Sequence, residues 1–265
     1  MERPDKSDDA EPPVERIRGL PVSRMSFGDT VRLLVAWAGV RGTTRYFACV
    51  NAHSAEVSHR DRAFMHALQS ADLLVADGAG VMVASRMLGG RIRERSTGPD
   101  LFLAVSQALD DLGNRSVFYL GGTPATLEKI RACHTARFPR LTIVGTYSPP
   151  FQAAFTASDV AKMADIIDRA APDVLWVGLG APKQEKLVLE LRDRVRVPLC
   201  GPVGAMFDYF AGNVPMPPVW VERVGLHWLY RLTKDPRRLW RRNLDSPLFL
   251  IRVLWDRLRG RGPDG

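Results

Sequence analysis

Short apolar runs and longer segments of helical periodicity alternate along most of this chain. The apolar runs are short enough to be buried strands and cover residues 46–50, 73–76, 116–120, 141–144, 173–179 and 197–200. Apolar residues between them recur at helical spacing, first after residue 27 and then at about 55–68, 81–88, 98–112 and 157–171. Strands that alternate with helices predict an α/β fold with a doubly wound, mostly parallel, Rossmann-like sheet.

Two of the predicted strands end in glycine. The run 73–76 is followed by Asp77, Gly78 and Gly80, and the run 116–120 is followed by Gly121 and Gly122. Ligands of open α/β sheets bind beyond the carboxyl ends of the strands, and a glycine turn before a helix suits a phosphate. Asp77, held rigidly at such an end, could act as a general base. A simple turn or a helix N-cap would show the same Asp-Gly pair, so this stretch alone leaves both interpretations open.

The character of the chain changes at residue 215, where the β-branched apolar runs stop. Tryptophan and leucine then recur at helical spacing near 220–232 and 239–254, with arginines between them and a potential break at Ser246-Pro247. Such basic amphipathic helices are typical of a membrane interface. A terminal helical hairpin packed on the domain would show the same pattern.

Charge is concentrated in the same region. Residues 215–265 contain eleven Lys and Arg against five Asp and Glu, so they carry +6 of the formal net charge of +8. This excess indicates an anionic partner such as lipid headgroups, a diphosphate or nucleic acid. We therefore divide the chain into a disordered tail at 1–15, an α/β catalytic domain at 16–214 and a basic helical appendage at 215–260.

Several familiar chemistries lack their motifs. The chain contains no GxxxxGK[ST], GxSxG or Asp-x-Asp sequence, and no GxGxxG follows the first predicted strand. Its five histidines and three cysteines match no metal site or disulfide framework; His59 and His66 are seven apart and are expected on a solvated helix face. We expect neither a metal nor another cofactor. The widely spaced cysteines, an N-terminus without an apolar stretch and the lack of an uncharged run near ~20 residues predict a cytoplasmic setting without a membrane span.

Seven short motifs stand in order between residues 17 and 242. They are Val50-Asn51-Ala52; Ala71-Asp72 with Asp77-Gly78-Ala79-Gly80; Glu94-Arg95 with Gly98-Pro99-Asp100; Leu120-Gly121-Gly122; Gly180-Ala181-Pro182-Lys183-Gln184-Glu185; Val203-Gly204-Ala205-Met206-Phe207-Asp208 with Ala211-Gly212; and Gly225-Leu226-His227-Trp228-Leu229-Tyr230-Arg231 with Pro236-Arg237-Arg238. Together these motifs resemble those of the WecG/TagA/CpsF glycosyltransferase family.

The resemblance implies an inverting, metal-independent transferase. Such an enzyme moves a sugar of the N-acetylmannosamine type from a UDP-sugar donor to an undecaprenyl-diphosphate-linked sugar acceptor, in surface polysaccharide or teichoic-acid-type assembly. The resemblance also implies a peripheral protein on the inner face of the cell membrane. The basic C-terminal helices could hold it there on anionic lipid.

The same resemblance assigns roles to individual residues. Asp77 matches the family's proposed base, and Asn51, Arg95 and Gln184 match further catalytic residues. The glycines at the strand ends, Gly78, Gly80, Gly121 and Gly122, are expected to contact substrate. The resemblance adds a contact at Asp208, near the nucleoside. It also adds contacts near the donor diphosphate at Arg231, Arg237, Arg238 and Arg241.

Each of these residues also has an ordinary structural interpretation. Asn51 could cap a helix, Gln184 and Asp208 could belong to first helical turns, and Arg95 could form a surface ion pair. The family's pattern is altered at Cys49, Met216 and His227, which leaves the donor and acceptor sugars open.

Three alternatives follow from these departures and from the charge. The protein could transfer another hexose such as glucose, or it could bind a UDP-sugar without catalysis. A nucleic-acid partner is disfavoured because the basic residues are interleaved with a large apolar face. The terminal apolar helix suits self-association as well as lipid, so a homo-oligomer stays open.

Overall fold

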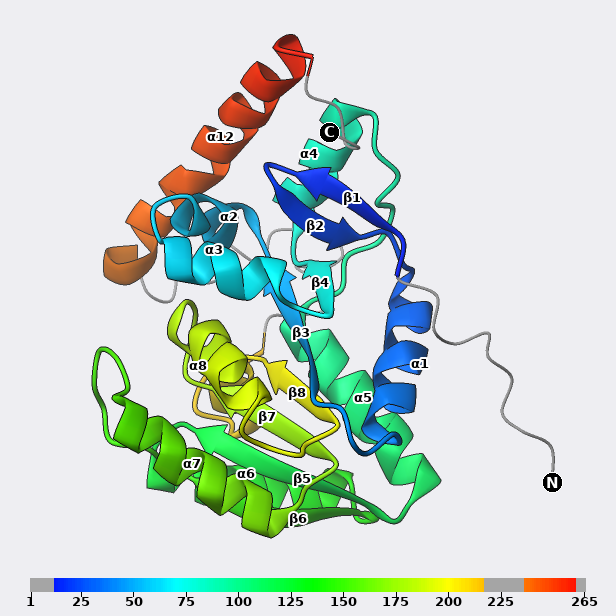
Figure 1. The fold of residues 1–265 in the computed structure, drawn as a ribbon, viewed down its shortest axis with the longest axis vertical. Helices are drawn as coiled ribbons and strands as arrows, with labels where there is room; N and C mark the ends of the chain where they lie inside the picture. The colour runs from blue at the N-terminus through cyan, green and yellow to red at the C-terminus, as the bar shows by residue number, and fades with distance from the viewer. Residues whose placement is uncertain (1–11, 217–235, 261–265) are drawn as a thin grey trace, which may run out of the picture.

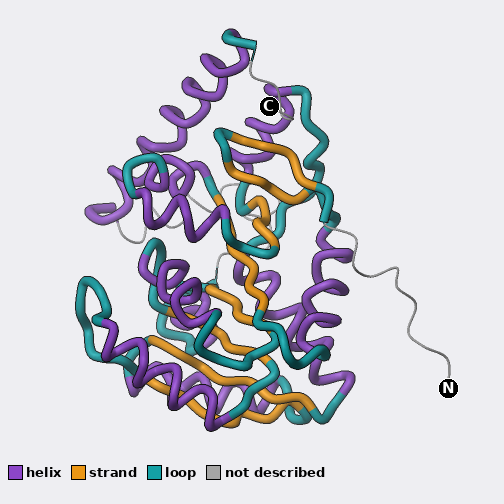
Figure 2. The backbone as a smooth tube through the Cα atoms, in the orientation of Figure 1, coloured by secondary structure: helices purple, strands orange, loops and turns teal. Residues whose placement is uncertain are grey.

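The computed structural model describes residues 12–216 and 236–260, with the backbone alone for 236–244 (Figures 1 and 2). Its centre is a six-stranded sheet with the strand order β4-β3-β8-β7-β5-β6. Every neighbouring pair in this sheet is parallel, which confirms the predicted doubly wound fold. The strands are β3 (Arg45–Val50), β4 (Leu73–Ala76), β5 (Arg115–Gly121), β6 (Leu141–Tyr147), β7 (Val174–Gly178) and β8 (Leu199–Pro202).

Both faces of the sheet are covered because successive side chains of a strand point to opposite sides. In β7, Val174 and Trp176 join one core cluster, whereas Leu175 and Val177 join the other. The first cluster includes α1 (Phe27–Ala38), α5 (Gly98–Leu112), α6 (Pro124–Arg137) and α9 (Met206–Phe210). The second includes α2 (Ala52–Ser58), α3 (Arg62–Gln69), α4 (Ala79–Leu88), α7 (Ala157–Ala170), α8 (Lys183–Arg192) and α12 (Pro236–Leu258).

Three local predictions needed correction. The helix expected over 55–68 is two helices, because Asp61 interrupts it and caps α3 by accepting the Phe64 amide at 3.1 Å. The tail expected to be disordered at 1–15 overlaps an antiparallel hairpin of β1 (Val14–Ile17) and β2 (Leu20–Ser23), which turns at Arg18-Gly19, where both residues have positive φ. The potential break at Ser246-Pro247 does not occur, since α12 continues through Pro247.

Other predictions fall outside the described residues. These are residues 1–11 of the expected tail, the expected helix near 220–232 and Arg231. Within the described ranges, none of the helices combines the length and the apolar character that a membrane crossing requires.

The terminal helix α12 lies on α2 and α4, two helices that are far from it in the sequence (Figure 1). Its side chains Phe249 and Val253 are fully buried in the second core cluster. A polar contact reinforces this packing, because Arg252 of α12 donates a hydrogen bond to Glu56 of α2, which is itself 0% exposed. Burial of a carboxyl group is costly unless it has such a partner.

Three further ion pairs fix the ends of the same contact. Asp245 lies 2.6 Å from His53 Nδ1 and 3.2 Å from Arg60. Near the other end of α12, Asp256 accepts a hydrogen bond from Arg18 at 2.8 Å. The helix is therefore attached to the hairpin and to α2 at several points along its length.

Close packing in the middle of the sheet gives a test of the fold. A Cβ atom at Gly201 of β8 would overlap the Trp176 ring and lie 2.8 Å from Cε1 of Phe47. We expect Gly201→Ala to lower the free energy of unfolding by about 1–3 kcal/mol, because both rings are confined between the sheet and α5. Urea unfolding followed by circular dichroism measures the change.

Gly28→Ala is the matched control. Gly28 lies exposed in the first turn of α1, and a Cβ there approaches only the flexible end of Arg32, at 3.7 Å. This substitution should leave stability unchanged or slightly raised. Equal unfolding midpoints for Gly201→Ala and Gly28→Ala would contradict the packing that we describe.

Candidate active site

Asn51 and Asp77 follow directly after two neighbouring parallel strands. Val50 of β3 pairs with Ala76 of β4, so the next residue of each strand lies at the same edge of the sheet. The Asp77 amide donates to the Val50 carbonyl at 2.8 Å, and Asn51 Nδ2 donates to Asp77 Oδ2 at 3.4 Å. Both side chains are half-buried. The structure thus holds a partly accessible carboxylate at the edge where ligands of such sheets bind, and this carboxylate could accept a proton.

Asn51 also has the structural role that the sequence allowed. Its side-chain oxygen caps α2 by accepting the Ser54 amide at 3.0 Å, and Ser54 Oγ in turn accepts the Asn51 amide at 2.8 Å. This capping box uses the amide oxygen, so the amide nitrogen must face Asp77. The cap and the contact with the carboxylate are therefore two consequences of one side-chain orientation.

The Gly78 turn brings α4 against the same edge. Gly78 has φ of 97°, a conformation that favours glycine, and it stands just before α4. Gly80 packs closely on the start of α2, because a Cβ at Gly80 would lie 3.1 Å from Ala52 Cβ. The Asp-Gly pair is thus a helix start and a strand-end carboxylate at once.

Arg95 lies in the loop between α4 and α5. The amide of its neighbour Ser96 donates to the carbonyl of Ala76 at 2.8 Å, which brings this loop to the end of β4 beside Asp77. The Arg95 side chain is half-buried. The structure therefore brings Arg95 to the same edge as Asn51 and Asp77.

Gln184 lies in the first turn of α8, beyond the end of β7. It is 5% exposed, and its Oε1 accepts the Gly180 amide at 3.1 Å. Its Nε2 donates to Oε1 of Glu185 at 2.9 Å. Across the site, a Cβ at Gly204 would lie 3.4 Å from Gln184 Oε1, so the turn after β8 packs directly over this amide.

Sequence reasoning missed Glu185. Its side chain is 2% exposed, and burial raises its pKa to about 7, while the hydrogen bond from Gln184 acts in the opposite direction. An acid in the first turn of a helix is usually exposed to solvent and interacts with the helix dipole. The residue type of Glu185 therefore did not indicate burial. Its position did carry a signal, because residues 184, 187, 188 and 191 form the buried face of α8 and residue 185 adjoins that face.

Cys49 links these groups across the sheet. Burial raises the pKa of its thiol well above the usual value, and the charges of Asp77, Glu185 and Asp100 raise it further. The motif Gly98-Pro99-Asp100 reaches the same place, since a Cβ at Gly98 would lie 3.7 Å from Cys49 Sγ. The charges of acids at the end of β4, in α5 and in α8 therefore all act on one half-buried thiol.

A second group of predicted residues gathers at the ends of β5 and β8. Gly121 and Gly122 have φ of 117° and 68° and make the turn that precedes α6. A Cβ at Gly122 would lie 3.6 Å from the Phe207 ring, next to the exposed Asp208 in α9. The turn and the acid are therefore neighbours.

Asn213, which sequence reasoning also missed, connects the two sides of this second group. Its Nδ2 donates to Asp208 at 3.3 Å and to Thr126 of α6 at 3.1 Å, and its Oδ1 accepts a hydrogen bond from Lys129 at 2.7 Å. No local sequence pattern predicts this contact, because it depends on the packing of α6 against α9. The arrangement places hydrogen-bond donors and acceptors beside a glycine turn that suits a phosphate.

The basic C-terminal residues are not placed with either group. Arg231 is outside the described residues, and for Arg237, Arg238 and Arg241 only the backbone of α12 is described. In the described part of the chain, no three His, Cys, Asp or Glu side chains are arranged to hold a metal ion.

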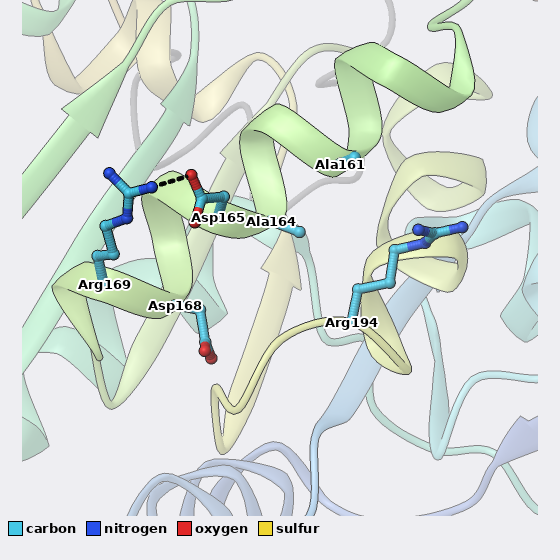
Figure 3. A pocket seen from close by; sticks show the side chains of 6 residues that line it. All are labelled: Ala161, Ala164, Asp165, Asp168, Arg169 and Arg194. Atoms are coloured by element: carbon cyan, nitrogen blue, oxygen red, sulfur yellow. Dashed lines mark hydrogen bonds and ion pairs between the residues drawn. The ribbon is translucent and has the colours of Figure 1, made fainter.

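A surface hollow of about 430 Å³ lies elsewhere, along α7 (Figure 3). The residues that line it are Ala161, Ala164, Asp165, Asp168, Arg169 and Arg194, and Asp165 is paired with Arg169. The C-terminal end of α7 leads into the start of β7, so this hollow lies toward the amino ends of the strands. It contains none of the predicted site residues.

Comparison with known proteins connects this geometry to one family. N-acetylglucosaminyldiphosphoundecaprenol N-acetyl-beta-D-mannosaminyltransferase of Bacillus subtilis is 31% identical over 205 residues, which are 77% of each chain. The protein of the same name from Bacillus spizizenii is 34% identical over 71% of this chain and 70% of the relative. A further one, from Staphylococcus aureus, is 24% identical over 72% of each chain. The model of the glycosyl transferase WecG/TagA/CpsF family matches residues 15–263, and the chain belongs to this family.

Proposed function

We propose that this protein transfers a sugar of the N-acetylmannosamine type from a UDP-sugar to an undecaprenyl-diphosphate-linked N-acetylglucosamine. The observation that carries the proposal is the pair of Asp77 and Asn51 at the adjoining ends of β3 and β4. The names of the relatives support the lipid-diphosphate acceptor and the N-acetylmannosaminyl group, and we assign UDP as the carrier of that group. The pathway is the assembly of a cell-surface polysaccharide or a teichoic-acid-type polymer.

In this reaction the acceptor hydroxyl attacks the anomeric carbon from the side opposite to the UDP group. Asp77 takes the proton of that hydroxyl as the new C–O bond forms and the bond to the β-phosphate oxygen breaks, so the configuration inverts. Asn51 keeps the Asp77 carboxylate oriented through its Nδ2 contact. The departing UDP retains the electrons of the broken bond as negative charge.

Basic groups of this chain neutralise that charge in place of a metal. Arg95 reaches the site from the loop packed on β4. We assign the remaining diphosphate contacts to Arg231, Arg237, Arg238 and Arg241, since guanidinium groups bind phosphate oxygens in pairs of hydrogen bonds. The turn at Gly121-Gly122, with Asp208 beside it, receives the nucleoside end of the donor.

The outer face of α12 supports a peripheral position on an anionic membrane. Ile251, Leu254, Trp255 and Leu258 are 64%, 45%, 56% and 72% exposed, and their spacing places them on one face of the helix. The opposite face buries Phe249 and Val253. Arg259 lies over the Trp255 ring at 4.8 Å, so apolar and cationic groups are combined as an interfacial helix requires. We refer to the four exposed residues as the α12 stripe.

Removal of the proposed base should separate catalysis from binding. We expect Asp77→Asn to lower kcat by about 10²–10⁴-fold, because an amide cannot accept the hydroxyl proton, while UDP binding stays near the wild-type value. UDP release from UDP-N-acetylmannosamine, with a lipid-diphosphate-N-acetylglucosamine acceptor analogue, measures kcat, and calorimetry measures binding.

The control for this experiment is Asp111→Asn, which makes the same chemical change at an exposed position of α5. It should retain full activity. If Asp77→Asn turned over as fast as Asp111→Asn, Asp77 would not be the base. If the wild type bound UDP but released none from any UDP-sugar, the non-catalytic alternative would replace our proposal. The assay is run with EDTA, and loss of turnover there would contradict metal independence.

Membrane binding should depend on the α12 stripe. We expect Leu254→Ser, Trp255→Ser and Leu258→Ser, introduced together, to weaken binding to phosphatidylglycerol vesicles at least tenfold. Each lost apolar side chain removes on the order of 1 kcal/mol of insertion energy. Sedimentation with vesicles measures the effect, with transfer to a water-soluble acceptor analogue as the check that the site is intact.

Leu112→Ser is the matched control, because Leu112 is 60% exposed at the end of α5, away from α12. Its vesicle binding should equal that of the wild type. Unchanged sedimentation of the triple variant would show that this face of α12 does not contact lipid, and analytical ultracentrifugation of both proteins would then test self-association through it.

A further inference from the structure

Glu185 is a buried carboxyl group with only half of its hydrogen-bonding capacity used. Its Oε1 accepts a hydrogen bond from Gln184 Nε2 at 2.9 Å. Its Oε2 is buried and has no hydrogen-bond partner among the residues that the structure describes. The whole residue is only 2% exposed, so its carboxyl group lies in the interior of the protein.

The partner of Glu185 is held from the other end as well. The Gly180 N–H group donates to Gln184 Oε1 at 3.1 Å, which identifies that atom as the oxygen and directs the nitrogen toward Glu185. One hydrogen of the amide nitrogen is then used by Glu185, and the other is left for a further acceptor. The position of this donor depends on both Gly180 and Glu185.

No cation neutralises Glu185 in the described part of the chain. The two lysines of its own helix turn elsewhere: Lys183 donates to the Gln152 carbonyl at 3.0 Å, and Lys186 donates to Asp61 of α3 at 2.5 Å. From β3, the titratable side chains that sense its charge are Tyr46 and Cys49. The charged side chains of α7 lie on exposed or half-exposed positions, and β8 presents the buried thiol of Cys200.

Two other acids act on the same place. Asp77 and Asp100 raise the pKa of the Cys49 thiol together with Glu185, so the charges of the three carboxyl groups act on the same region of the protein. A buried carboxylate without a cation is costly, and a second negative charge beside Asp77 would also repel an anionic donor. A proton on Glu185 removes both costs.

We propose that Glu185 is a positioning residue for the transfer reaction, which holds the Gln184 amide toward the donor and, when it loses its proton, weakens donor binding by adding a second negative charge to the site. This inference rests on the proposed function. It assigns to the chain a residue that acts through Gln184 and through charge, because its Oε1 is already bound by the Gln184 amide.

The direction of the pH effect follows from the burial. Because burial raises the pKa of Glu185 to about 7, the side chain is mostly neutral at pH 6 and mostly ionised at pH 8. In the unfolded chain it ionises near the ordinary value for glutamate, so between that value and pH 7 the folded state holds the extra proton. The contribution of Glu185 to the free energy of unfolding therefore falls as the pH rises toward 7, and it stays low above pH 7.

Glu185→Gln tests the charge without removing the contact, since a glutamine at 185 can still accept from Gln184. We expect the KM for the UDP-sugar, and the Kd for UDP by calorimetry, to match wild type at pH 6 and to be at least threefold lower than wild type at pH 8. Comparison at each pH cancels the titration of UDP itself. The Tm of Glu185→Gln should exceed that of the wild type at pH 8 by more than it does at pH 5.

Glu185→Met tests the contact. It removes the acceptor, so kcat should fall at least tenfold at both pH values, and Glu185→Gln should restore most of the loss. Glu190→Gln, at an exposed position of the same helix, is the control and should follow the wild type throughout.

The outcomes separate the two proposals. A wild-type protein that neither binds UDP nor turns over a UDP-sugar would overturn the proposed function and this inference with it. An active wild type whose KM, Kd and Tm differences from Glu185→Gln are the same at pH 6 and pH 8 would overturn the inference alone. A purely structural role would lower the Tm of both variants without any pH-dependent change in KM.

Discussion

The register between β3 and β4 is the constraint on which the site depends. Pairing of Val50 with Ala76 brings the next residue of each strand to the same edge, and there Asn51 meets Asp77. A slip of β4 by one residue would turn its side chains to the opposite faces of the sheet, and Leu74 would exchange one core cluster for the other. The two buried clusters therefore fix the position of the carboxylate more firmly than its own 3.4 Å contact does.

Helix α2 connects this edge with the terminal helix. Its first residues follow the Asn51 cap, and its buried Glu56 binds Arg252 of α12 and lies 3.8 Å from Arg18 Nε. The proposed membrane contact and the proposed base are thus attached to opposite ends of a helix of two turns. A lipid surface that holds α12 would also hold α2, and with it the amide that orients Asp77. The same arrangement explains why a basic terminal helix can be part of the core without losing an exposed apolar face.

Much of this fold could be predicted from the sequence because its signals are local. Runs such as 73–76 and 173–179 are apolar on both faces, and glycine punctuates the ends of two strands. Asn51 and Asp77 could be placed at strand ends for the same reason. Their contact depends on which strands pair, and the periodicity of the sequence does not predict the strand order. Glu185 was missed because its residue type indicates exposure, whereas packing of α8 on β3 and β8 buries it. Asn213 was missed because all three of its partners are distant in the chain or across a turn.

Asp77 and Glu185 are two carboxyl groups of one site in contrasting surroundings. Asp77 is half-buried at a strand end with an amide donor beside it, whereas Glu185 is enclosed and bonded at one oxygen only. Pairs of this kind separate the protonation states of their members, so that one is available as an anion while the other keeps its proton. In the proposed reaction, which binds a diphosphate donor and removes a proton, one anion is needed and a second is a disadvantage. The burial of Glu185 meets that requirement through packing, since the described residues provide no cation to balance it.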